Sequence, residues 1–167
     1  KMDKVRNKVI VFGGDHSNAL GVIRALGENG IRPIVYSVTD NFVSAISKSK
    51  YIEESYIYNN EIDALGDMEE RFGNERIKPI LIPTSDNAAS IIDRNYERLK
   101  GKFITQNAGE KNNTVTALMD KKEQFALSSK HGLKMARTVA ITLPFFVDKN
   151  KKMSYPLILK PQLSIDG

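Results

Sequence analysis

The 167-residue chain contains no cysteine and no tryptophan. Without cysteine it can form neither a disulfide framework nor a cysteine-ligated metal site. Its longest apolar runs, such as residues 9–12, have the length of a strand rather than of a membrane span, and the N-terminus has no signal-peptide core. With a hydrophobic content of 41%, the composition predicts a soluble globular protein of the cytoplasm that has no membrane partner.

Histidine is scarce, and several catalytic motifs are missing. His16 and His131 lie far apart without a partnering ligand pattern, which disfavours a zinc site. The sequence has no G-x-S-x-G motif for a serine nucleophile and no G-x-x-x-x-G-K-S/T phosphate loop. These absences exclude a P-loop and leave other nucleotide-binding folds open.

The net charge of +5 raises the question of an acidic partner. Basic residues are spread along the chain and interleaved with acidic ones, whereas a nucleic-acid surface needs them clustered on one face. We therefore expect no nucleic-acid partner. A nucleotide triphosphate remains compatible, because it needs only a few well-placed positive groups.

Residues 1–107 alternate between strand-like and helix-like patterns, as expected for an α/β domain. Apolar, partly β-branched runs predict strands, and amphipathic stretches bounded by capping residues or glycine predict helices. We expect a Rossmann-like, mostly parallel sheet flanked by helices. Its expected strands are residues 8–12, 32–36, 51–58, 79–82 and 102–105, its expected helices residues 17–29, 62–72 and 85–99, and residues 41–50 read as a short helix or turn.

Residues 108–167 have a different rhythm and are predicted to be a second domain. Residues 108–116 are polar and turn-rich, which is typical of a linker. A helix is expected over residues 120–131, with Asp120 as its cap, followed by strands over residues 138–141 and 156–159. Because the sequence stops in what reads as a loop after the last strand, we expect a truncated α+β lobe.

Two candidate ligand-binding turns each follow a predicted strand and precede a predicted helix. The first contains Gly13 and Gly14, and the second is the P-T-S-D run that ends at Asp86. Open α/β sheets bind ligands outside the carboxyl ends of their strands, so both turns are candidates to line one crevice. Alternatively, the glycines only make a tight turn, and Ser85 or Asp86 is only a helix cap. Arg24 is a further candidate for a substrate carboxylate, although it could be a solvated surface residue.

The glycine pattern does not fit a dinucleotide site. Glycines at positions 13, 14 and 21 do not form G-x-G-x-x-G, and the second predicted strand is not followed by the acidic residue that would hold a ribose hydroxyl. NAD binding is therefore disfavoured.

Two lysines in the second domain are the strongest candidates for phosphate contacts. Lys160 is the second-to-last residue of the run Y-P-L-I-L-K-P, where strand alternation would place it on an apolar face, and a buried ammonium needs an anion. Lys121 lies in the first turn of a predicted helix, where its charge opposes the helix dipole. Alternatively, the charged end of Lys160 reaches solvent at the rim of the sheet. Lys121 and Lys122 could likewise be an ordinary exposed pair.

Taken together, these segments resemble the ATP-grasp superfamily of carboxylate–amine ligases, in particular the large chain of carbamoyl-phosphate synthase. The resemblance rests on Asp120-Lys121, on G-L followed by T at residues 132–138, on Y-P-L-I-L-K-P, and on the preceding α/β domain with its G-G, R-A-L-G and P-T-S-D runs. Ala136 departs from this pattern, because the family often has proline there, and the loop of residues 162–167 has few small residues.

The resemblance implies a function and a set of site residues. ATP would be bound by Lys121 and Lys160 and by a closing loop that includes Ser164 and Gly167, and a small carboxylate by Gly13, Gly14, Arg24 and Asp86. The carboxylate would be activated as an acyl-phosphate and attacked by an amine.

The resemblance also implies Mg²⁺, whose ligands would lie beyond Gly167, so we expect the chain alone to be inactive. A homodimer is left open. The rival interpretation is a Rossmann-like module that binds a nucleotide or sugar phosphate without ligase activity.

Overall fold

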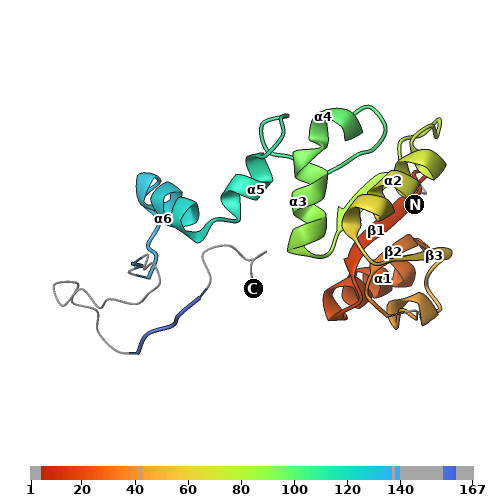
Figure 1. Cartoon of the computed structure of the whole chain (residues 1–167), viewed down its shortest axis with the longest axis horizontal. Coiled ribbons are helices and arrows are strands. Elements are labelled where there is room, and N and C mark those ends of the chain that lie inside the picture. The colour runs from red at the N-terminus through yellow and green to blue at the C-terminus, as the bar shows by residue number, and fades with distance from the viewer. Residues whose placement is uncertain (1–4, 42, 137, 140–155, 161–167) are drawn as a thin grey trace. The chain divides into compact units, whose positions relative to one another are not determined.

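The computed structural model describes residues 5–41, 43–136, 138–139 and 156–160. The chain divides into two compact units, Lys1–Thr116 and Ala117–Gly167. Figure 1 shows the elements of both units in chain order. The first unit therefore includes residues 108–116, which the sequence pattern predicts to be a linker.

The first unit is built on a four-stranded sheet in which each pair of neighbouring strands is parallel. A fifth predicted strand is present only as a parallel bridge between Ile80 and Ile104. The parallel α/β fold is thus confirmed. The sheet has the order β3-β2-β1-β4, formed by β1 (Val9–Gly14), β2 (Ile34–Val38), β3 (Glu54–Tyr58) and β4 (Ile80–Pro83).

Helices cover both faces of this sheet (Figure 1). On one face, α1 (Ser17–Glu28) packs its buried Ala19 and Ile23 against the strands. The other face is covered by α2 (Glu61–Phe72) and α3 (Asp86–Arg94). The short 3-10 helix η1 (Ile46–Lys48) lies between β2 and β3 in the chain.

The predicted helix over residues 85–99 is in fact two helices, α3 and α4 (Tyr96–Leu99). Asn95 separates them, with φ −108° and ψ 15°. Its amide side chain donates to the Ile91 carbonyl at 2.8 Å, and its own carbonyl accepts from the N–H groups of Arg98 and Leu99. An asparagine that bonds to nearby backbone in this way competes with helix continuation.

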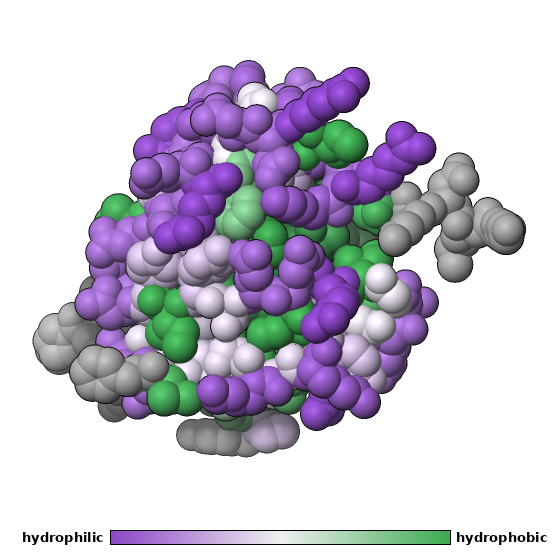
Figure 2. Space-filling view, turned by 90° about the vertical axis from the view of Figure 1, so that its right-hand side faces the viewer, coloured by the Kyte–Doolittle hydropathy of each residue, from purple (hydrophilic) through white to green (hydrophobic). Residues whose placement is uncertain are grey.

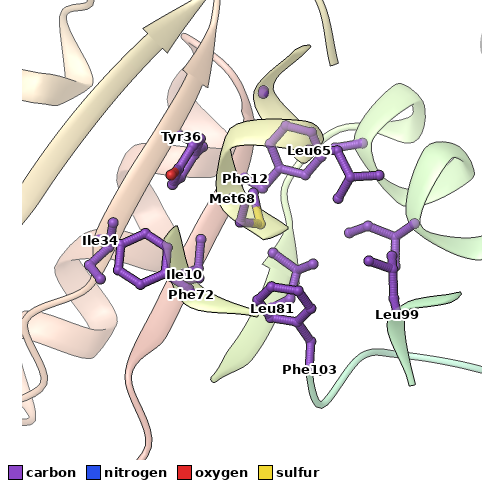
Figure 3. Packing of buried hydrophobic residues seen from close by; sticks show 13 residues of the cluster. Ile10, Phe12, Ile34, Tyr36, Leu65, Met68, Phe72, Leu81, Leu99 and Phe103 are labelled. Carbon is purple, nitrogen blue, oxygen red and sulfur yellow. The ribbon is translucent and has the colours of Figure 1, made fainter. Parts of the chain in front are cut away.

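Strand alternation explains the two-sided core. Ile10 and Phe12 of β1 belong to the cluster under α2 and α3, whereas Val11 between them belongs to the cluster under α1. Figure 3 shows the larger cluster, in which side chains from the sheet, α2, α4 and the segment after α4 pack together. Its labelled members are Ile10, Phe12, Ile34, Tyr36, Leu65, Met68, Phe72, Leu81, Leu99 and Phe103.

One face of the molecule is shown by hydropathy in Figure 2. Figure 2 shows hydrophilic residues over most of the displayed face, with small separate hydrophobic areas between them. Within the described residues, no helix has both the length and the apolar character needed to traverse a lipid bilayer.

Two helices are described at the boundary and in the second unit. The first, α5 (Thr114–Leu118), extends across the boundary between the units. The second, α6 (Lys121–Lys130), begins as predicted after Asp120, whose carboxylate accepts a hydrogen bond from the Lys122 N–H at 2.7 Å.

The predicted strand over residues 156–159 is wrong. Residues 157–160 have no strand conformation, and Leu157, Ile158 and Leu159 are 46%, 82% and 80% exposed. A strand needs a neighbour to pair with, and within the described part of the chain these residues pair with none. Of the predicted strand at residues 138–141, residues 138 and 139 are not in a strand, and the other two lie outside the described residues.

Candidate ligand site at the carboxyl edge of the sheet

The sheet order creates a topological switch point between β1 and β4. The chain moves from β1 outward to β2 and β3, and then crosses to β4 on the other side of β1. The loops that leave the carboxyl ends of β1 and β4 diverge to opposite faces, and ligands of open α/β folds bind in the resulting crevice. Both predicted turns leave the sheet at this point.

Gly13 is in direct contact with the second turn. A Cβ atom on Gly13 would lie 2.5 Å from Thr84 Oγ1 and 3.1 Å from the Ser85 backbone nitrogen. Its φ of +153° is also a conformation that residues with a side chain rarely adopt. The structure therefore brings the Gly13 turn and the Ser85 turn together, and glycine is the residue that permits this close approach.

The two helices that start at this edge have different N-termini. At α1, no side chain caps the first turn, and no acidic residue lies in it. At α3, the Ser85 hydroxyl accepts a hydrogen bond from the Ala88 N–H at 3.2 Å, so Ser85 is the cap. Asp86 follows it, exposed in the first turn. The start of α1 therefore favours a negative group, and the start of α3 carries a negative charge of its own.

Asp15 is a structurally important residue that the sequence patterns did not indicate. Its carboxylate accepts hydrogen bonds from the Ser44 hydroxyl at 3.0 Å, the Ala45 N–H at 2.8 Å and the Ile46 N–H at 3.0 Å. These bonds attach the loop before η1 to the Gly13 turn. The only signal in the sequence was that an acidic residue directly follows Gly13 and Gly14. An acidic residue is unexpected in a glycine-rich phosphate-binding turn, because its negative charge would repel the phosphate.

The electrostatics of Asp15 follow from these contacts. Burial alone would raise the pKa of its carboxyl group, but the hydrogen bonds from Ile46, Ala45 and Ser44 outweigh this effect and lower the pKa below its ordinary value. Asp15 is therefore held in its charged form. A negative charge beside the Gly13 turn favours a singly charged ligand group there over a pyrophosphate.

Three buried side-chain oxygens without a hydrogen-bond partner were also missed by sequence reasoning. Ser37 is fully buried near the carboxyl end of β2, opposite Gly13 in the strand register, and its Oγ atom has no partner among the described residues. Two further buried oxygens, Thr105 Oγ1 and Asn107 Oδ1, also have no hydrogen-bond partner among the described residues. Both residues follow the Ile104 bridge. Unpaired buried oxygens are rare in folded proteins, and no hydrophobic pattern in the sequence could have located them.

Arg24 is exposed on α1, seven residues after Ser17. At the rise of an α-helix, this separation places its backbone about 10 Å along the helix axis from Ser17. Its role in binding the carboxylate stays a prediction.

The predicted nucleotide-binding residues lie in the second unit. Lys121 is the first residue of α6 and is half-buried. Lys160 is exposed and does not project from a strand, which corrects the expectation that it emerges from an apolar sheet face. The convergence of these two lysines on one ligand stays a prediction. Ser164 and Gly167 lie outside the described residues.

Metal-binding groups were sought across the described ranges. None of these residues forms a group of three or more histidine and acidic side chains that could hold a metal ion.

Neither the family models nor the curated proteins that were searched match this chain.

Proposed function

We propose that the protein is an ATP-dependent ligase that joins a small carboxylic acid to an amine. In this proposal the acid binds at the switch point of the first unit, and Lys121 and Lys160 contact ATP. The observation that carries the proposal is the contact between Gly13 and the Thr84–Ser85 turn, which brings two loops together at the carboxyl edge of the sheet, where open α/β folds bind ligands.

The uncapped start of α1 supports an acid as the ligand, whereas the carboxylates of Asp15 and Asp86 at the same edge oppose a second negative group. The first turn of α1 offers backbone N–H groups that no side chain caps, and such a turn favours a carboxylate. Asp86, exposed at the start of α3, would attract a positive or hydroxyl-bearing part of the same molecule. A small acid that also carries an amino or hydroxyl group fits both features.

The proposed reaction has two steps. An oxygen of the carboxylate attacks the γ-phosphorus of ATP, the bond from that phosphorus to the bridging oxygen breaks, and ADP leaves. The amine then attacks the carbonyl carbon of the acyl-phosphate, inorganic phosphate leaves, and the amine nitrogen loses its proton. Lysine ammonium groups would offset the charge on the phosphates. Mg²⁺, when bound, would further offset this charge, and we assign no step to it.

A second candidate function is a module that binds a nucleotide or sugar phosphate without ligase activity. The first unit favours it, because its sheet is covered by helices on both faces and its core is complete without residues from the second unit. The exposed, non-strand conformation of residues 157–160 also gives no support to an ATP-binding lobe.

Binding of ATP tests the roles proposed for the two lysines. We expect Lys160→Ala to weaken the affinity for magnesium–ATP at least tenfold, which corresponds to about 1.4 kcal/mol. Lys130→Ala is the matched control, because Lys130 is an exposed lysine in the last turn of α6. Unchanged affinity in folded Lys160→Ala protein would contradict the proposed role of this lysine.

A further inference from the structure

Asp93 is a buried carboxylate that the proposed function does not use. It lies on α3 and is 0% exposed. Its Oδ2 atom accepts a hydrogen bond from the Thr116 N–H at 2.7 Å, and its Oδ1 atom accepts one from the Thr114 hydroxyl at 3.5 Å. Both partners belong to α5, so a side chain of one helix caps the start of another.

Other contacts attach the same segment to the first unit. The Thr116 hydroxyl donates to Ser90 Oγ at 3.4 Å, and the Asn113 N–H donates to the Asp93 carbonyl at 3.4 Å. One step earlier in the chain, Asn112 Oδ1 accepts from the Glu97 N–H at 2.8 Å. Residues 112–116, expected to be a linker, are thus bonded to α3 and α4.

The energetics make this attachment depend on Asp93. A helix of five residues is too short to be stable alone, and the N–H groups of its first turn have no partners within the helix. Burying a carboxylate is costly unless hydrogen bonds compensate it. The Asp93 carboxylate is the acceptor for the N–H and hydroxyl groups at the start of α5, and these groups are the donors that the buried carboxylate needs. Loss of either partner should therefore free the start of α5 from α3.

We propose that Asp93 is a tether that holds the start of α5 on the first unit. Thr116, the last residue bonded to the Asp93 carboxylate, is also the last residue of that unit. The tether replaces what the sequence pattern predicts to be a free linker at residues 108–116. This inference does not depend on ATP or on ligase activity.

Hydrogen exchange of the full chain tests the tether. In Asp93→Ala protein, we expect the Thr116 amide and the peptide over residues 110–118 to exchange at least tenfold faster, while amides of β1 and β4 keep their wild-type rates. Trypsin cleavage after Lys111 should accelerate in parallel, because the exposed Lys111 lies in the released segment. The control is Asp86→Asn, which alters a carboxylate at the opposite end of the same helix and should leave both readouts unchanged.

A second variant covers the case in which Asp93→Ala does not fold. Asp93→Asn keeps the size of the side chain but removes its charge, and should give a smaller acceleration confined to residues 110–118. Wild-type exchange at Thr116 in either folded variant would overturn the proposal. So would equal acceleration throughout the first unit, because that would mark Asp93 as a general core residue.

Discussion

The described residues of the two units differ in how far their apolar side chains are buried. In the first unit, side chains from four strands and from helices on both faces of the sheet are buried in two clusters. In the second unit, none of the described residues is buried, and Leu127, Leu133, Ile158 and Leu159 are each more than 40% exposed. Among the described residues, apolar side chains are therefore buried where other elements pack against them, as in the first unit, and are exposed elsewhere.

One substitution made in both units should show this difference most clearly. Leu81 in β4 is 3% exposed, whereas Leu159 is 80% exposed. We expect Leu81→Ala to lower the free energy of unfolding by about 3 kcal/mol, because it leaves a cavity in the core. Leu159→Ala should change it by less than about 0.5 kcal/mol. Urea denaturation followed by circular dichroism measures both, and similar losses would remove the contrast.

Removing Asp15 should have the next largest effect. Asp15→Ala deletes three hydrogen bonds that hold the loop before η1, and we expect a loss of about 2 kcal/mol in the free energy of unfolding at neutral pH. Asp40→Ala, which alters an exposed acidic residue, is the control.

The pH dependence of this loss gives a second test. Because the pKa of Asp15 is lowered in the folded state, its contribution is present above the pKa of the unfolded chain, about 4, and decreases as the pH falls through the folded value. The difference between the wild-type and Asp15→Ala proteins should therefore shrink in acid. A constant difference from pH 7 to pH 3 would show that the charged form of Asp15 is not the stabilising one.

The sequence predicted most of the first unit, because its local signals agree with the tertiary structure. Apolar β-branched runs such as that of β1 formed strands, and asparagine or serine caps fixed the starts of α2 and α3. The observed ends of several strands and helices differ from the predicted ends by one to three residues, because the end of an element depends on packing. Asn95 was missed because its effect depends on the hydrogen bonds of its own side chain.

The candidate site was predictable only in part. The two turns at Gly13 and Asp86 could be located from strand-to-helix transitions, and the principle of carboxyl-end ligand sites placed them together. The roles of Asp15 and Asp93 could not be predicted, because their partners lie between 21 and 31 residues away in the chain. The strand over residues 156–159 was overpredicted because an apolar pattern does not reveal whether a pairing neighbour exists.

The smallest expected effect concerns helix propensity. Gly66 is exposed in α2, and nothing lies within 4 Å of where its Cβ would be. Gly66→Ala should raise the free energy of unfolding by about 0.5–1 kcal/mol. Ser129→Ala, at an exposed position of α6, should leave the main unfolding transition unchanged, because α6 contributes no buried residue. Equal stabilisation by both variants would mean that the two units unfold as one.

ADP release by the full-length protein is the most direct test of the proposed ligase activity. The protein would be incubated with magnesium–ATP and a panel of small acids bearing amino or hydroxyl groups, each with and without an amine. We predict ADP release that requires an acid, with C–N bond formation when the amine is added. The absence of acid-dependent ADP release across the panel, in a folded protein that binds sugar phosphates, would contradict the ligase and favour the binding module.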